Sequence, residues 1–157
     1  MKKELVSCWM SHDPITVTPN TAMLDAGNIM RKYEIRRLPV VDDNGKLVGI
    51  VTQGDIREAS PSDANSLSIW ELNYLLTKVK VKQIMIHNPI TVYSTDTIST
   101  AASLMLKNKV GGLPVINPLY GFLMGIITET DIFRLIVRTW REPGAEEVTR
   151  EINGVTQ

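Results

Sequence analysis

Two Thr-x-x-Asp-Ile motifs are the residues of this chain best suited to bind a ligand. They close the segments GIVTQGDI (49–56) and GIITETDI (125–132), which lie 76 positions apart. A carboxylate can accept two hydrogen bonds from the cis-diol of a ribose, while a Thr hydroxyl and the N–H groups at a helix start can bind phosphate. The same spacing also suits a helix cap, with Thr as the N-cap residue and the acid three positions later. The motif alone leaves both interpretations open.

The motifs belong to an internal repeat. MSHDPITV (10–17) matches MIHNPITV (85–92) at an offset of 75, and LPVV (38–41) matches LPVI (113–116). After the turns DDNGK and NPLYG the offset becomes 76. Each copy has about 50 matched residues, which is a small unit for an independent core, so we expect the two copies to pack face to face.

Within each copy the pattern alternates between strand and helix signals. PITV is short and β-branched and predicts a strand. Asn20 and Thr95 hold matching positions where the next helix is expected to be capped. Two apolar runs follow, joined in the first copy by Asn44-Gly45, a strong hairpin signal. A second helix follows each Thr-x-x-Asp, so each copy predicts strand, helix, strand, strand, helix.

The chain divides into four predicted segments. Residues 1–66 form the first unit and 81–141 the second. Between them, residues 67–80 predict an amphipathic helix with Leu67, Trp70, Tyr74 and Leu75 on one side, which either covers the first unit or meets another subunit. Residues 142–157 are polar and are expected to be disordered.

Composition narrows the class of protein. Lys and Arg together number 17, as do Asp and Glu, so no overall field favours nucleic acid or a membrane surface. Cys8 is the single cysteine and cannot form an intrachain disulfide, which favours the cytosol. No segment reaches the roughly 20 apolar residues of a membrane span. We expect a cytoplasmic protein with no nucleic-acid or membrane partner.

Taken in order, the elements M-x-x-[DN]-P-I-T-V, L-P-V-[VI] and G-I-[VI]-T-x-x-D-I closely resemble a CBS domain. The chain resembles a tandem pair of such domains, a Bateman module, over roughly residues 6–138, and the segment between the copies resembles that of acetoin-utilisation-type CBS proteins. The resemblance implies an α/β (α+β) fold of two pseudo-twofold-related βαββα units with two clefts. It further implies a homodimer whose clefts bind AMP, ADP, ATP or S-adenosylmethionine.

The resemblance implies a non-enzymatic regulatory module, of the energy-sensing kind, that transmits ligand occupancy to an unknown partner protein. The alternative is an association module that dimerises without a ligand. The residues that the resemblance assigns to cleft 1 are Ile15, Thr16, Val17, Arg37, Leu38, Pro39, Thr52 and Asp55. Those assigned to cleft 2 are Ile90, Thr91, Val92, Gly112, Leu113, Pro114, Thr128 and Asp131.

The two copies differ in charge around these positions. The first has Arg36-Arg37 where the second has Gly111-Gly112, and Gln53 where the second has Glu129. Because Arg favours phosphate and a nearby Glu opposes it, cleft 1 is expected to prefer phosphate-rich ligands. Cleft 2 is expected to prefer AMP or a less anionic adenosine compound.

Other candidate chemistry is weaker. His12 and His87 hold equivalent positions but lack the partner residues of a metal site, so no metal is expected. Asp55 and Asp131 could be imagined as a catalytic pair, but no nucleophile or phosphate-binding loop accompanies them. We therefore expect no enzymatic activity and no catalytic cofactor.

Overall fold

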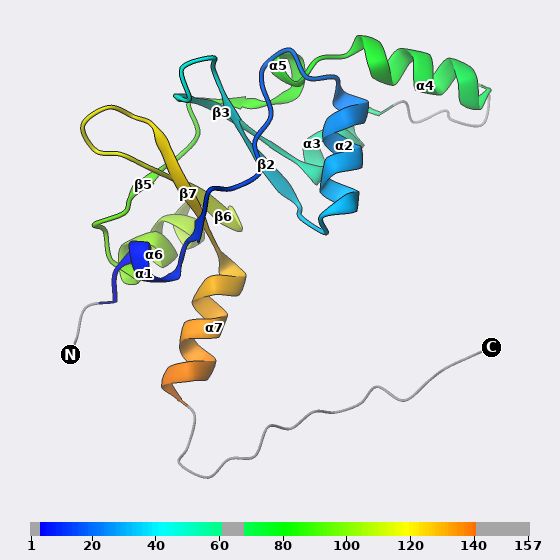
Figure 1. The fold of residues 1–157 in the computed structure, drawn as a ribbon. Coiled ribbons are helices and arrows are strands. Elements are labelled where there is room, and N and C mark those ends of the chain that lie inside the picture. Colours follow the sequence, from blue (N-terminus) through cyan, green and yellow to red (C-terminus); the bar gives the residue numbers. More distant parts are fainter. Residues whose placement is uncertain (1–3, 61–67, 141–157) are drawn as a thin grey trace, which may run out of the picture.

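The computed structural model describes residues 4–60 and 68–140, which form two halves that each contain a hairpin sheet and two principal helices (Figure 1). The predicted tail, residues 142–157, lies outside the described residues. The predicted mixed α+β fold of two βαββα units is confirmed.

The first copy is built on the hairpin of β2 (Arg37–Val41) and β3 (Leu47–Thr52). Its turn contains Gly45 at φ +80°, a left-handed conformation that glycine adopts without strain. Helices α2 (Met23–Lys32) and α3 (Gln53–Ala59) accompany this sheet. Its core consists of Val17, Ala26, Met30, Leu38, Val40, Val51 and Val81.

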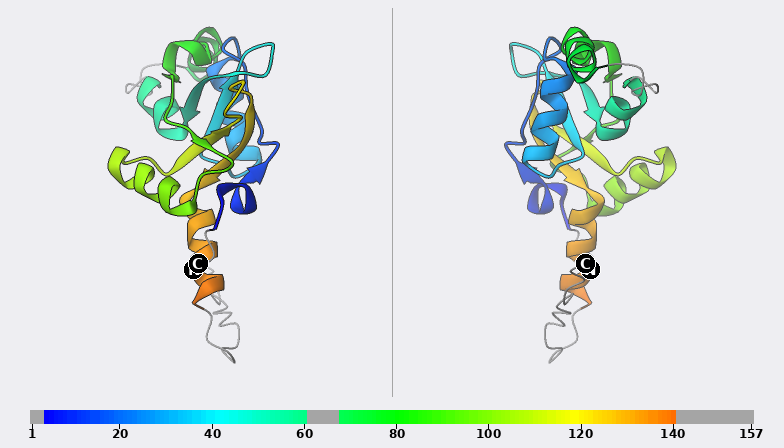
Figure 2. Two further views of the ribbon diagram at one scale, coloured as in Figure 1. Left: turned by 90° about the vertical axis from the view of Figure 1, so that its left-hand side faces the viewer. Right: turned by 90° about the vertical axis from the view of Figure 1, so that its right-hand side faces the viewer.

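The second copy repeats this arrangement. The hairpin of β6 (Gly112–Ile116) and β7 (Leu123–Thr128) is joined by β5 (Val92–Tyr93), which lies parallel to β6. Helix α6 (Ile98–Asn108) precedes the hairpin and α7 (Glu129–Thr139) follows it. Figure 2 shows α7 extending away from the two sheets. The core consists of Val6, Met10, Val92, Ile98, Ala101, Met105, Leu113, Val115 and Ile127.

The two copies exchange their first strands. After the short helix α1 (Val6–Trp9), strand β1 (Ser11–His12) pairs antiparallel with β7 of the second copy. After α5 (Val81–Ile84), strand β4 (Ile86–His87) pairs with β3 of the first copy. The exchange joins the copies by backbone hydrogen bonds as well as by apolar packing.

The exchanged strands β1 and β4 lie a few residues before the PITV segments that were predicted to be the first strands. In the first copy, PITV keeps only a single parallel bridge, from Val17 to Val40. At each strand crossing, a backbone carbonyl of the opposite copy explains why the repeated Gly-Ile motif has a glycine. A Cβ on Gly125 would lie 2.6 Å from the Ser11 carbonyl oxygen, and one on Gly49 would lie 2.9 Å from that of Ile86. Only glycine lets the crossing strands approach this closely.

The helix starts also differ from the prediction. Helix α2 begins after Ala22 and α6 after Thr97, two residues later than the predicted caps at Asn20 and Thr95. The Thr97 hydroxyl accepts a hydrogen bond from the Thr100 N–H at 3.1 Å, which makes Thr97 the effective cap.

The predicted helix between the copies is α4 (Ile69–Lys78), which contacts α2 and so lies on its own first copy. Trp70 and Tyr74 of the predicted apolar side are exposed and do not cover the first copy, whereas Leu72 and Leu76 are half-buried. Leu67 lies outside the described residues, and a contact of this side with another subunit stays a prediction. Leu72 and Leu76 are spaced at i, i+4 and lie on one face of the helix. In the part of the chain that the structure describes, no helix is long and apolar enough to cross a membrane.

Candidate functional site

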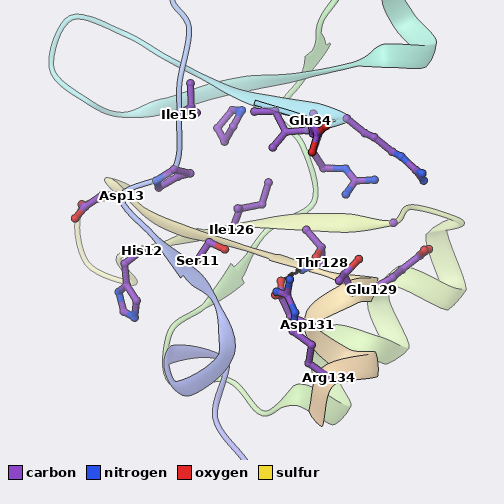
Figure 3. Close-up of a pocket in the computed structure, with 17 residues that line it drawn as sticks. Ser11, His12, Asp13, Ile15, Glu34, Ile126, Thr128, Glu129, Asp131 and Arg134 are labelled. Atoms are coloured by element: carbon purple, nitrogen blue, oxygen red, sulfur yellow. Dashed lines mark hydrogen bonds and ion pairs between the residues drawn. The ribbon is translucent and has the colours of Figure 1, made fainter. Parts of the chain in front are cut away.

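A cavity of about 570 Å³ lies where the two copies meet, at the start of α7 (Figure 3). Four segments contribute to it: the strand β1 and the residues after it, the chain leading into β2, the start of β6, and the junction of β7 with α7. The lining residues are Ser11, His12, Asp13, Pro14, Ile15, Glu34, Ile35, Arg36, Arg37, Pro39, Gly111, Ile126, Thr128, Glu129, Thr130, Asp131 and Arg134.

Asp131 is the most buried charged group of the cavity, with 4% of its surface exposed. Its Oδ2 accepts hydrogen bonds from the backbone N–H and the hydroxyl of Thr128, both at 2.8 Å. Its Oδ1 accepts from Nη1 of Arg134 at 2.9 Å. The carboxylate is thus fixed in orientation at the positive end of an eleven-residue helix.

Arg37 reaches the cavity from the first copy and lies across Gly111 and Gly112. A Cβ on Gly112 would lie 2.8 Å from Arg37 Nη1, so the two glycines form the surface that receives the guanidinium. Burial lowers the pKa of Arg37, Glu129 raises it, and Arg36 lowers it. The largest effect is the loss of water around the cation, which a nearby anion would offset.

The residues that line this cavity come from both of the clefts that were predicted from the sequence. Ile15, Arg37 and Pro39 were assigned to the cleft of Thr52 and Asp55, but they line the cavity of Thr128 and Asp131. The exchange of first strands explains the position of Ile15, because β1 lies on β7 and carries the residues after it to the second copy. Arg37, on β2, reaches the cavity across Gly111 and Gly112. The structure places these three residues beside Asp131, and their assignment to the cleft of Asp55 stays a prediction.

The cavity also bears on the predicted contrast in charge between the clefts. Arg36, Arg37 and Glu129 all line it, and the ligand preference of each cleft stays a prediction. The cavity of Asp131 contains the cations that the sequence assigned to the phosphate-preferring cleft.

Several predicted contact residues serve the core. The side chains of Val17, Leu38, Val92 and Leu113 belong to the two hydrophobic clusters. Pro114 is fully buried, and Gly112 is buried beneath Arg37. Ile90 is 38% exposed, and Thr16 and Thr91 are half-buried.

In the first copy, Thr52 and Asp55 form a complete capping box at the start of α3. Asp55 Oδ2 accepts from the Thr52 N–H at 2.7 Å and from its hydroxyl at 2.9 Å. The Asp55 N–H in turn donates to the Thr52 hydroxyl at 3.2 Å. Both interpretations of the motif are compatible with this geometry, since Asp55 is half-buried and, among residues 4–60 and 68–140, no hydrogen bond is made to its Oδ1.

Sequence reasoning missed Ser11, His12, Asp13, Glu34 and Thr130 as cavity residues. Only the strand exchange brings the first three to Asp131, and no local signal in the sequence announces it. Glu34 has φ +54°, and Figure 3 shows it across the cavity from Asp131. Within residues 4–60 and 68–140, no cluster of His, Cys, Asp and Glu has the arrangement of a metal site.

Comparison with known families decides the identity of the fold. The family model of the CBS domain matches residues 3–62 and again residues 81–138. The chain belongs to the CBS domain family. It contains two CBS domains in tandem, as a CBS pair.

Solved CBS pairs resemble the chain over most of its length. The CBS domain pair of protein MJ0100, solved in complex with 5′-methylthioadenosine and S-adenosyl-L-methionine, is 33% identical with a TM-score of 0.72, covering 87% of this chain and 98% of that one. CBSX2 of Arabidopsis thaliana in complex with AMP is 30% identical with a TM-score of 0.73, covering 88% and 99%. The predicted likeness to acetoin-utilisation proteins is confirmed by AcuB of Vibrio cholerae, 29% identical with a TM-score of 0.71, covering 90% and 99%.

Among curated relatives, L-aspartate semialdehyde sulfurtransferase of Methanocaldococcus jannaschii is 34% identical over 131 residues. These are 83% of this chain but only 23% of the relative, so the similarity covers the CBS pair and not the greater part of that protein.

Proposed function

We propose that the cavity beside Asp131 binds an adenosine-containing compound and that the chain is a non-enzymatic regulatory module. The observation that carries this proposal is the buried, fixed carboxylate of Asp131 in a cavity shared by the two CBS domains. Its oxygens are suited to the cis-diol of a ribose.

The cations of the cavity can bind an anionic group of the ligand. Arg36, Arg37 and Arg134 line it beside four acids, Asp13, Glu34, Glu129 and Asp131. Because burial lowers the pKa of Arg37, a phosphate beside its guanidinium would stabilise the protonated form and gain a charge-assisted hydrogen bond. AMP, ADP and ATP fit this requirement, and AMP is bound by the related CBSX2. S-adenosylmethionine, bound by the MJ0100 pair, carries positive charge and is the less favoured candidate.

Ligand occupancy can alter the relative setting of the two domains. The cavity is lined from the first copy by Arg37 and from the second by Asp131. A ligand that contacts both favours the arrangement in which both contacts are made, which is the requirement for a regulatory shift.

A second function, association with another copy of this chain, is favoured by the outer face of α7. Phe133, Val137 and Trp140 are 63%, 67% and 77% exposed. Their spacing at i, i+4 and i+7 forms an apolar stripe of the kind that packs against another protein surface. We propose a homodimer through this stripe; the sequence predicted a homodimer without specifying its interface.

Thermal unfolding with AMP, ADP, ATP and S-adenosylmethionine tests the ligand proposal. A ligand at about 100 times its Kd should stabilise the protein by about 2.7 kcal/mol. Asp131→Asn should remove the shift, and the matched Asp55→Asn variant should retain the part that comes from the cavity of Asp131. No shift with any of the four compounds would leave the association function, which sedimentation of wild type and Val137→Glu would then examine.

A further inference from the structure

The ion pair between Asp131 and Arg134 joins a buried group to an exposed one. The Asp131 side chain is 5% exposed and the Arg134 side chain 68%. Thr128 holds Oδ2 with two hydrogen bonds, while Arg134 alone contacts Oδ1. Because the guanidinium is exposed, Arg134 can exchange this partner for another when the buried Asp131 carboxylate gains a new hydrogen-bond donor in its place.

This cation is a property of the second copy only. At the offset of 76, Asp55 is equivalent to Asp131, and Glu58 is equivalent to Arg134. An ionised Glu cannot donate a hydrogen bond, so the first copy has no such partner at that position. The repeat therefore keeps the acid and changes the group that neutralises it.

The position of Arg134 has opposite consequences for neutral and anionic ligands. Because Oδ2 already accepts two hydrogen bonds, a ribose diol must rely on Oδ1, where it meets Arg134. An uncharged nucleoside must share or displace that contact without compensation. A nucleoside with an anionic group offers the guanidinium a new partner within the same cavity.

We propose that Arg134 is a specificity-determining residue that selects anionic adenosine compounds over uncharged ones. This inference rests on the proposed function of the cavity and adds the role of one residue and the chemical class of the ligand. Arg36 and Arg37, in contrast, belong to the first copy, and the hydrogen bonds of the Asp131 carboxylate within the described residues come from Thr128 and Arg134.

Calorimetric titration of AMP and of uncharged 5′-methylthioadenosine into wild type and Arg134→Gln tests the inference. The variant should bind AMP about tenfold more weakly, because a charge-assisted hydrogen bond is lost. It should bind 5′-methylthioadenosine equally well or up to about fivefold more tightly, because the competing ion pair is gone. Arg134→Lys, which keeps the charge, should retain most of the preference for AMP.

Glu58→Gln is the matched control, since it makes a similar change at the equivalent position of the first copy, and it should leave both affinities within about twofold. If Arg134→Gln weakens both compounds equally, the inference is overturned while the proposed function stands. If wild type binds none of the adenosine compounds, the proposed function fails and the inference fails with it. Unliganded circular dichroism spectra of the variants establish that each is folded.

Discussion

The two copies of the repeat carry the same Thr-x-x-Asp motif in different surroundings. Asp55 and Asp131 each accept hydrogen bonds from the N–H and the hydroxyl of their own Thr. Asp131 is buried and ion-paired with Arg134, whereas Asp55 is half-buried and followed by Glu58. The motif thus caps the helix that follows it in each copy. The residues around the carboxylate decide which other contacts it can make.

The decisive neighbour comes from the opposite copy. At the Asp131 end, Arg37 of the first copy lies across the bare backbone of Gly111 and Gly112. Arg36-Arg37 and Gly111-Gly112 are equivalent positions of the repeat. The Arg37 side chain of the first copy occupies the space that the glycines of the second copy leave open. A duplicated fold can in this way build unequal sites from nearly equal motifs.

The largest expected difference between the two copies is the loss of stability when Asp131 or Asp55 is removed. Asp131→Ala should lower the free energy of unfolding by about 3 kcal/mol, because Thr128 and Arg134 lose a charged acceptor. Asp55→Ala should cost about 1 kcal/mol, because water can reach the half-buried Thr52. Urea denaturation measures both, and equal losses would contradict the comparison.

The strand crossings give a second, slightly smaller effect. Gly125→Ala and Gly49→Ala should each destabilise the fold by about 1–3 kcal/mol, because the added Cβ meets a backbone carbonyl. Gly125→Ala should also weaken AMP binding, since it displaces Ser11 from the cavity wall. Gly49→Ala should leave the affinity of the Asp131 cavity unchanged, and AMP titration of both variants separates the two effects.

Arg37→Ala should weaken AMP binding about tenfold, equivalent to about 1.4 kcal/mol. The half-buried guanidinium is held across Gly111 and Gly112, so it is already oriented toward the cavity. Arg36, which is exposed, provides the matched variant, and Arg36→Ala should have a smaller effect. Calorimetry with AMP would contradict the role of Arg37 if the two variants behaved alike.

The smallest expected effect comes from making the two ends more alike. Gln53→Glu gives the first copy the acid that the second has in Glu129. A negative charge at the start of α3 should stabilise the fold by about 0.3–1 kcal/mol through the helix dipole. AMP affinity should stay constant, because Gln53 does not line the Asp131 cavity. A measurable loss of affinity would show that the ends are coupled.

Local chemistry explains what could be predicted from the sequence. The hairpin at Asn44-Gly45, the helices after Thr52 and Thr128, and the family resemblance all depend on residues close together in the chain. Turn conformation and helix capping are decided by such neighbours. The sequence by itself therefore determined the repeat, the βαββα order and the two acids.

The tertiary structure alone decided which residues meet. β1 pairs with β7 across more than 100 positions, and that pairing brings Ser11 and Ile15 to Asp131. Strand pairing at this distance depends on the shape and burial of both copies together, which no local pattern contains. The same packing places Arg37 beside Asp131, because Gly111 and Gly112 have no Cβ to occupy the space of its side chain.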